Sequence, residues 1–237
     1  MNNEILRRGL ASWKMESSSA IERDFEIYKD LLLQYNKVMN LTNITKEDEV
    51  YTKHFLDSIS CLYAYDIPNG ARLIDVGTGA GFPSLPMKIM RRDLHLTLLD
   101  SLNKRVEFLR KVGEALSLEK VDYIHSRAED LARDPLHRET YDFAVSRAVA
   151  NLSTLLEYTV PFLKKGGILL CQKGPQVEEE LHMAKTALKL LGARLIKKVE
   201  IPLEGTDLAH NILVIKKVET TAKKYPRKAG KPSKEPL

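Results

Sequence analysis

The stretch that decides the fold class is residues 73–83, which read LIDVGTGAGFP. A short apolar run leads into an acidic residue, Asp75, and then into glycines at positions 77, 79 and 81. Glycine adopts a positive φ at little cost and lets a ligand lie against bare backbone, while the first N–H groups of a following helix point at that ligand. The stretch therefore predicts a strand, a binding turn and a helix that together hold a nucleotide-like molecule.

A second acidic residue, Asp100, ends the next apolar run, residues 94–99. Nucleotide-binding βαβ units place a ribose-binding carboxylate at about this point, roughly 20 residues after the glycines. The spacing G-x-G-x-G differs from the dinucleotide pattern G-x-G-x-x-G, and no Lys-Ser or Lys-Thr follows as in a P-loop. The pattern resembles that of class I methyltransferases, which implies S-adenosylmethionine as the cofactor. The alternative is a glycine turn in an ordinary α/β protein.

Helical periodicity comes first along the chain and alternating strands and helices follow. Apolar residues recur at helical spacing over residues 18–39, and Thr45 with Asp48 has the form of a capping box for a helix to about residue 62. We expect strands near 72–76, 94–99, 121–125, 141–146 and 167–172. The intervening helices are expected near 83–91, 103–116, 151–163 and 176–191. Two further strands, 194–201 and 211–217, are joined without a helix through Pro202-Leu203-Glu204-Gly205.

This rhythm predicts an α/β fold, a doubly wound, Rossmann-like and mostly parallel sheet of seven strands. Residues 1–65 form an N-terminal helical cap, residues 66–217 the methyltransferase core and residues 218–237 a basic extended tail. No stretch approaches the roughly 18 apolar residues of a membrane span. The two cysteines form no C-x-x-C pair, the start lacks a signal-peptide profile, and the histidines gather no metal-ligand set, so we expect a cytoplasmic protein without a metal.

The positive charge of the chain, formally +5, is concentrated at its C-terminal end. Residues 216–237 carry eight Lys or Arg side chains against two Glu, interleaved with Tyr225 and three prolines. An extended cationic segment with an aromatic ring suits RNA phosphates and a stacked base. We therefore expect removal of the tail to weaken RNA binding without changing cofactor affinity. The alternative is a solvated tail that only aids solubility.

Further motifs resemble, as a set, those of one bacterial family, the small-subunit ribosomal RNA guanine-N7 methyltransferases, also called glucose-inhibited division protein B. They are Tyr35-Asn36, Asn40-Leu41-Thr42, His54, Asp57-Ser58-Ile59, Phe82-Pro83, Arg127-Ala128-Glu129, Ser146-Arg147-Ala148, Lys173-Gly174 and the tail Tyr225-Pro226-Arg227-Lys228-Ala229-Gly230. The resemblance runs from about Phe25 onward. It implies methylation of a guanine in the 530 loop of 16S ribosomal RNA, on naked RNA or on a small-subunit particle. We also expect the protein to be a monomer.

Site residues follow from the motifs and the resemblance together. The cofactor-binding set is Asp75, Gly77, Gly79, Phe82, Asp100, Ala128, Glu129 and Arg147. The RNA-binding set is Lys173, Lys223, Lys224, Arg227 and Lys228. The resemblance places Ala128 and Glu129 at the adenine and Arg147 near the methionine end and the target base. Glu129 as a helix-capping acid and Arg147 as a structural ion pair are the alternatives.

The residue types also bear on which atom is methylated. Carbon methylation of a pyrimidine needs a cysteine nucleophile, but Cys61 and Cys171 fall in a helix and a buried strand. Exocyclic amines are usually methylated by an Asp or Asn followed by Pro-Pro and an aromatic residue, where this chain has Ser146-Arg147-Ala148. Guanine N7 has a free lone pair, so Arg147 would orient the base and no general base is expected. Two rival hypotheses are a nicotinamide oxidoreductase and a noncatalytic RNA-binding factor.

Overall fold

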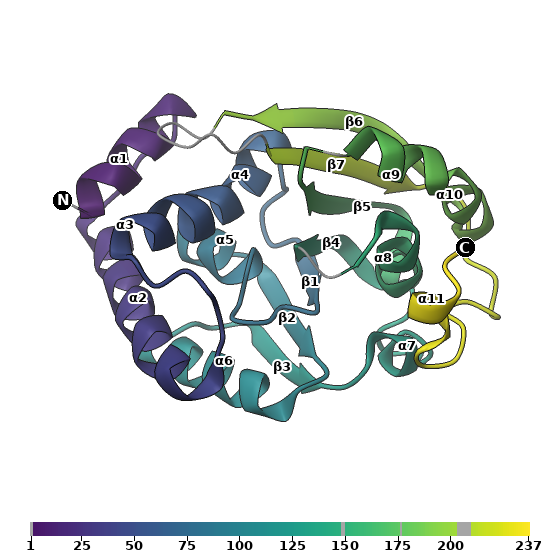
Figure 1. The fold of residues 1–237 in the computed structure, drawn as a ribbon, viewed down its shortest axis with the longest axis horizontal. Coiled ribbons are helices and arrows are strands. Elements are labelled where there is room, and N and C mark those ends of the chain that lie inside the picture. Colours follow the sequence, from purple (N-terminus) through teal and green to yellow (C-terminus); the bar gives the residue numbers. More distant parts are fainter. Residues whose placement is uncertain (1, 148–149, 176, 203–209) are drawn as a thin grey trace.

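A seven-stranded sheet with the order β3-β2-β1-β4-β5-β7-β6 runs through the molecule (Figure 1). The computed structural model describes residues 2–147, 150–175, 177–202 and 210–237. Strands β1 to β5 are parallel, and β7 is antiparallel to both β5 and β6. The strands are β1 Arg72–Val76, β2 His95–Asp100, β3 Val121–His125, β4 Tyr141–Arg147, β5 Leu163–Lys173, β6 Ala193–Ile201 and β7 His210–Lys217. The predicted doubly wound, mostly parallel sheet is confirmed.

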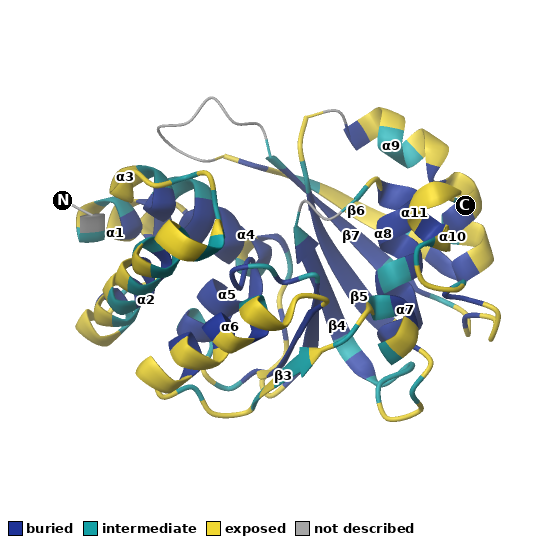
Figure 2. Ribbon diagram, turned by 60° about the horizontal axis from the view of Figure 1, so that its bottom comes forward, coloured by how far each residue is buried: buried dark blue, intermediate teal, exposed yellow. Residues whose placement is uncertain are grey.

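Helices cover both faces of the sheet, α1 to α6 on one side and α7 to α11 on the other (Figure 2). On the first side lie α1 Asn2–Ser12, α2 Ser19–Met39, α3 Glu47–Val50, a π-helical turn Tyr51–Leu56, α4 Asp57–Ala64, α5 Ser84–Met90 and α6 Asn103–Ala115. On the second side lie α7 Ala128–Leu131, α8 Leu152–Thr159, a 3-10 turn Val160–Phe162, α9 Val177–Met183, α10 Lys185–Leu191 and α11 Lys231–Lys234. None of the described helices is long and apolar enough to cross a membrane.

Each face of the sheet has its own hydrophobic core, because the central strands are apolar on both sides, as strands of a covered parallel sheet must be. Leu73 of β1 faces the core under α2, α5 and α6, and its neighbour Ile74 faces the core under α8 and α10. The edge strands β3 and β6 are only partly buried. The polar ends of β1, β2 and β4 are thereby held at one rigid edge.

The N-terminal helices share the first of these cores with the helices of the sheet. Phe25 and Tyr28 of α2 lie in the same apolar cluster as Leu85 of α5 and Phe108 of α6. Tyr28 also stacks on Phe82, with 5.6 Å between ring centroids. Residues 2–65 therefore pack onto the core through this cluster, and helix α2 supports the glycine turn.

Several boundaries differ from those that the sequence predicts. The helix after Thr45 begins at Glu47 with Lys46 as its N-cap, and no side chain caps it. The segment expected as one helix over 151–163 ends at Thr159, because the 3-10 turn that contains Pro161 follows. The segment expected as a helix over 176–191 is divided into α9 and α10. The link through Leu203, Glu204 and Gly205 lies outside the described residues.

The C-terminal segment, residues 221–237, packs against the core instead of lying extended. It contains α11, which lies beside α7 and α8 in Figure 1. The guanidinium group of Arg227 makes bonds of 2.7–3.1 Å to the carboxylate of Glu157, which is fully buried in α8. Tyr225 and Pro232 are buried as well. The expectation of an extended tail does not hold, because a buried carboxylate and a buried aromatic ring fix this segment in place.

Candidate active site

The glycine turn after β1 has free space beside Gly79 but is tightly packed at Gly81. Gly77, Gly79 and Gly81 all have a positive φ, of 73°, 61° and 100°. An added Cβ at Gly79 meets no atom within 4 Å, whereas at Gly81 it would lie 2.4 Å from Cδ1 of Leu85. Gly79 therefore faces open space where a ligand can approach the backbone, and Gly81 is required for the packing of α5.

The two predicted acidic residues take different places. Asp100, at the end of β2, accepts hydrogen bonds from the backbone N–H groups of Gly79 and Leu102, both at 2.9 Å, and lines the cavity at the turn. Asp75 is fully buried beneath the turn, where it accepts from the Ser84 hydroxyl at 2.5 Å, and burial raises its pKa to about 7. Asp75 therefore shapes the turn and the start of α5, and of the two acids only Asp100 lines a described cavity.

Three adjoining cavities follow the carboxyl edge of the sheet, where ligands bind in open α/β folds. The middle cavity, about 380 Å³, is lined by Leu41, Thr42, His54, Gly77, Thr78, Gly79, Ala80, Phe82, Asp100, Ser101, Arg105 and Arg147. A cavity of about 180 Å³ shares Gly77 and Ser101 with it and extends to Ala128 and Glu129. A cavity of about 620 Å³ shares His54 and Arg147 with it and extends to Lys173 and His210. The edge thus offers three neighbouring cavities with shared walls.

Arg147, at the end of β4, is common to the middle and the largest cavity. Its guanidinium donates to Oδ2 of Asp57 at 2.9 Å, to the Lys53 carbonyl at 3.2 Å and to Nδ1 of His54 at 3.1 Å. It also lies over the Phe82 ring, 4.6 Å from the centroid. These contacts fix the plane of the guanidinium group, so its charge is held ready at the boundary between two cavities.

Two histidines flank Arg147 and differ in charge. Burial, together with the positive charge of Arg147, lowers the pKa of His54 to about 3, so this ring is neutral; it stacks on Phe82 and its Nε2 lies 2.7 Å from the Thr42 hydroxyl. His210, at the start of β7, bonds through Nδ1 to Oδ1 of Asp57, and this bond raises its pKa. Around Arg147, therefore, His54 carries no charge and His210 is the group that titrates.

A comparison of the sequence with known proteins identifies the family to which a chain with this glycine turn and these cavities belongs. Residues 21–204 match the model of the family described as rRNA small subunit methyltransferase G. The chain belongs to this family. It is 52% identical over 210 residues to Ribosomal RNA small subunit methyltransferase G of Alkaliphilus metalliredigens, which covers 89% of this chain and 88% of that protein. The protein of the same name from Alkaliphilus oremlandii is 50% identical over 99% of this chain and 98% of its own length.

Solved structures at lower identity support the fold alone. TrmN from Thermus thermophilus superposes with a TM-score of 0.53 at 18% identity, over 69% of this chain and 48% of that chain. A SAM-dependent methyltransferase from Aquifex aeolicus superposes with a TM-score of 0.50 at 21% identity, over 67% and 89%. Both agree with a class I methyltransferase fold for this member of the methyltransferase G family.

The structure brings the cofactor-binding residues predicted from the sequence to one edge, with a single exception. Gly77, Gly79, Phe82, Asp100, Ala128, Glu129 and Arg147 all line the middle or the smallest cavity. Asp75 lies beneath them and lines none of the cavities described here. The described residues hold no group of three or more His, Cys, Asp or Glu arranged for a metal ion.

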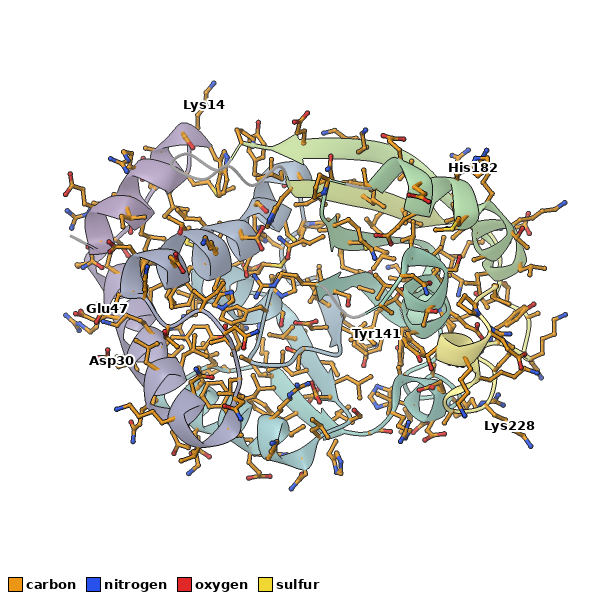
Figure 3. The ribbon with its side chains drawn as sticks, in the orientation of Figure 1. Lys14, Asp30, Glu47, Tyr141, His182 and Lys228 are labelled. Atoms are coloured by element: carbon orange, nitrogen blue, oxygen red, sulfur yellow. The ribbon has the colours of Figure 1, made fainter. Side chains whose placement is uncertain are left out.

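The residues expected to bind RNA divide into two groups. Lys223, Lys224 and Lys228 are exposed, and Lys228 projects from the edge of the molecule in Figure 3. Lys173 is buried in the largest cavity, where its Nζ bonds to Glu180 and to the Ala150 carbonyl, both at 2.7 Å. Arg227 is engaged with Glu157. Because Lys173 and Arg227 each have an intramolecular partner, their geometry does not favour direct contact with RNA.

Several residues that line the site were not predicted from the sequence as site residues. His210 meets Asp57 across 153 positions of sequence, and Gly230 and Ser233 of the C-terminal segment line the smallest cavity beside Glu129. No short-range pattern places these residues next to the glycine turn. In the cap, the motifs of the resemblance included Leu41, Thr42, His54 and Asp57, which line the middle or the largest cavity, but they assigned no role to these residues.

Proposed function

We propose that this protein transfers a methyl group from S-adenosylmethionine to N7 of a guanine in the 530 loop of small-subunit ribosomal RNA. The observation that carries the proposal is the place of Arg147. The chain belongs to the methyltransferase G family. Arg147 lines both the middle cavity, which lies at the glycine turn, and the largest cavity. A group at that position can touch both the reacting end of a cofactor and the base that receives the methyl group.

The residues of the middle and smallest cavities fit S-adenosylmethionine. Open space over Gly79 allows a ligand to approach the backbone, and Asp100 offers its carboxylate to a ribose diol. Ala128 and Glu129 provide an apolar wall and a polar edge for the adenine. When bound, this cofactor supplies an electrophilic methyl group on a sulfonium centre. The fit requires neither a pyrophosphate-binding turn nor a metal.

The largest cavity supplies what N7 methylation needs from the protein. The N7 lone pair is available without removal of a proton, so the contribution of the protein is orientation and electrostatic stabilisation. Arg147 has a fixed plane, and its guanidinium can donate to guanine O6 or to an adjacent phosphate. Asp57, in the same cavity, accepts from Arg147 at 2.9 Å and so helps to hold the guanidinium group in place.

The two cysteines do not support a mechanism with a covalent intermediate. Cys61 and Cys171 are both fully buried, and burial raises the pKa of each thiol, that of Cys171 to about 12. A protonated thiol inside the core is a poor nucleophile. This argues against methylation of a ring carbon.

The proposal includes a monomeric enzyme that acts in the cytoplasm on ribosomal RNA or on a small-subunit particle. Its support is that one chain lines all three cavities and that the chain belongs to a family named for ribosomal RNA.

Titration calorimetry with S-adenosylmethionine and with NAD tests the cofactor. We expect the first to bind and the second not, and Gly79→Arg to abolish binding because its side chain fills the open space over the turn. Incubation with labelled S-adenosylmethionine and ribosomal particles at several stages of assembly, followed by mapping of the methyl group, tests the substrate. Tighter binding of NAD, a methyl group on another atom, or no turnover on any particle would overturn the proposal.

A further inference from the structure

The smallest cavity is lined by residues of the sheet edge and by residues of the C-terminal segment. Val76, Leu99, Ser126, Ala128 and Glu129 come from strand ends and the start of α7, whereas Gly230 and Ser233 come from the last part of the chain. Resting on the proposed function, we propose that residues 221–237 form a wall of the cofactor site at its adenine end. Cofactor binding and the docking of this segment then stabilise each other.

The segment is docked by buried and charged groups along its length. Arg227 binds the fully buried Glu157 through its side chain and its backbone N–H, and Arg138 donates to the carbonyl oxygens of Thr221 and Tyr225 at 2.8 and 2.9 Å. Arg133 donates to the carbonyl of Pro226. These bonds to backbone carbonyls define the path of the segment, so residues 230–233 reach the cavity in a fixed position.

One hydrogen bond links the segment directly to a cofactor residue. The backbone N–H of Gly230 donates to Oε1 of Glu129 at 2.9 Å. Glu129 is almost fully buried, so this bond fixes a carboxylate that would otherwise lose its solvation without compensation. Gly230 has a φ of 81°, which directs its N–H while leaving room beside it. The orientation of the Glu129 carboxylate therefore depends on the docked segment.

The chemistry of this cavity suits an adenine ring. Val76, Leu99 and Ala128 provide apolar walls, and the Glu129 carboxylate is an acceptor for an exocyclic amine. Because Gly230 and Ser233 line the same cavity from the side of the segment, a ligand at this place contacts both parts of the chain. Coupling of this kind is reciprocal, so whatever holds the segment in place strengthens cofactor binding.

A bulky substitution in the full-length chain tests the inference through binding alone. Ser233→Phe places a ring at the wall of a cavity of about 180 Å³. We expect it to weaken binding of S-adenosylhomocysteine roughly tenfold or more, since overpacking of a filled site is costly. Lys234→Phe changes the neighbouring exposed residue, which does not line the cavity, and should leave the affinity unchanged. Titration calorimetry measures both, and thermal unfolding verifies that both variants fold.

A second measurement uses the wild-type protein. Saturating S-adenosylhomocysteine should slow tryptic cleavage after Lys228 but not after Lys14, which lies at the other end of the molecule (Figure 3). If Ser233→Phe binds as tightly as Lys234→Phe, or if the ligand leaves cleavage after Lys228 unchanged, the inference is wrong while the proposed function stands. If the wild type binds no S-adenosylhomocysteine, the proposed function fails and the inference with it.

Discussion

The Nδ1 atom of His210 lies 2.6 Å from Oδ1 of Asp57, and the bond joins the start of β7 to the start of α4. The other carboxylate oxygen of Asp57 accepts from Arg147 at 2.9 Å. Both oxygens of a buried carboxylate are thus engaged with cationic or titrating groups in the largest cavity. The position of Arg147 therefore depends on a pair that the cap and the C-terminal half of the chain form together.

This pair predicts a pH-dependent contribution to stability. The bond to Asp57 raises the pKa of His210 in the folded protein. A raised folded pKa stabilises the protein fully below the unfolded value, about 6.5, and the contribution is lost as the pH rises through the folded pKa. Replacing His210 with Gln should therefore lower the free energy of unfolding more at about pH 5.5 than at about pH 8.5. Urea unfolding at both pH values measures this, and an equal loss at both would contradict it.

The contacts of Arg147 predict that its removal slows methyl transfer and that lysine at this position does not restore the rate. Arg147→Ala should slow single-turnover methyl transfer by about 10²-fold or more, the scale of lost orientation or electrostatic stabilisation. Arg147→Lys should remain slow, because one ammonium group cannot serve Asp57, His54 and the base in a fixed plane. Rapid-quench assays with saturating RNA measure the rate. Single-turnover rates within threefold of wild type for either variant would remove Arg147 from the reaction.

Arg227 was expected from the sequence to bind RNA, but its ion pair with Glu157 predicts a structural role. Arg227→Met leaves the carboxylate of Glu157 buried without its partner and should destabilise the protein by about 3–5 kcal/mol. Lys228→Ala changes the next residue, which is exposed, and should alter stability by no more than about 0.5 kcal/mol. Chemical denaturation separates the two. Similar stabilities for both variants would mean that the segment is held by other contacts.

The sequence predicted the sheet and most of its edge because both depend on local patterns. Apolar runs that end in Asp100 and Arg147 place those residues at one edge once the strands are parallel. The C-terminal segment could not be placed in the same way. Its lysines and prolines are typical of a solvated tail. The segment is docked instead because Arg227 pairs with Glu157, which is buried in α8 and lies 70 positions away in the sequence. Because Gly230 and Ser233 line the smallest cavity, we expect the segment to affect cofactor binding as well, an effect that the composition of the tail did not predict.

The exposed lysines of the C-terminal segment predict a salt effect on RNA binding that is separate from cofactor binding. Each phosphate contact contributes about 0.7 to 0.9 to the slope of log affinity against log salt, so replacing Lys223, Lys224 and Lys228 together with Ala should lower the slope by roughly 2 to 3. Cofactor affinity should not change, because none of the three lines a described cavity. Filter binding over a salt series measures the slope, with Lys14→Ala, at the other end of the molecule in Figure 3, as the control that leaves it unaltered. An unchanged slope in the triple variant would assign RNA binding to the cavity edge and leave these lysines a role in solubility.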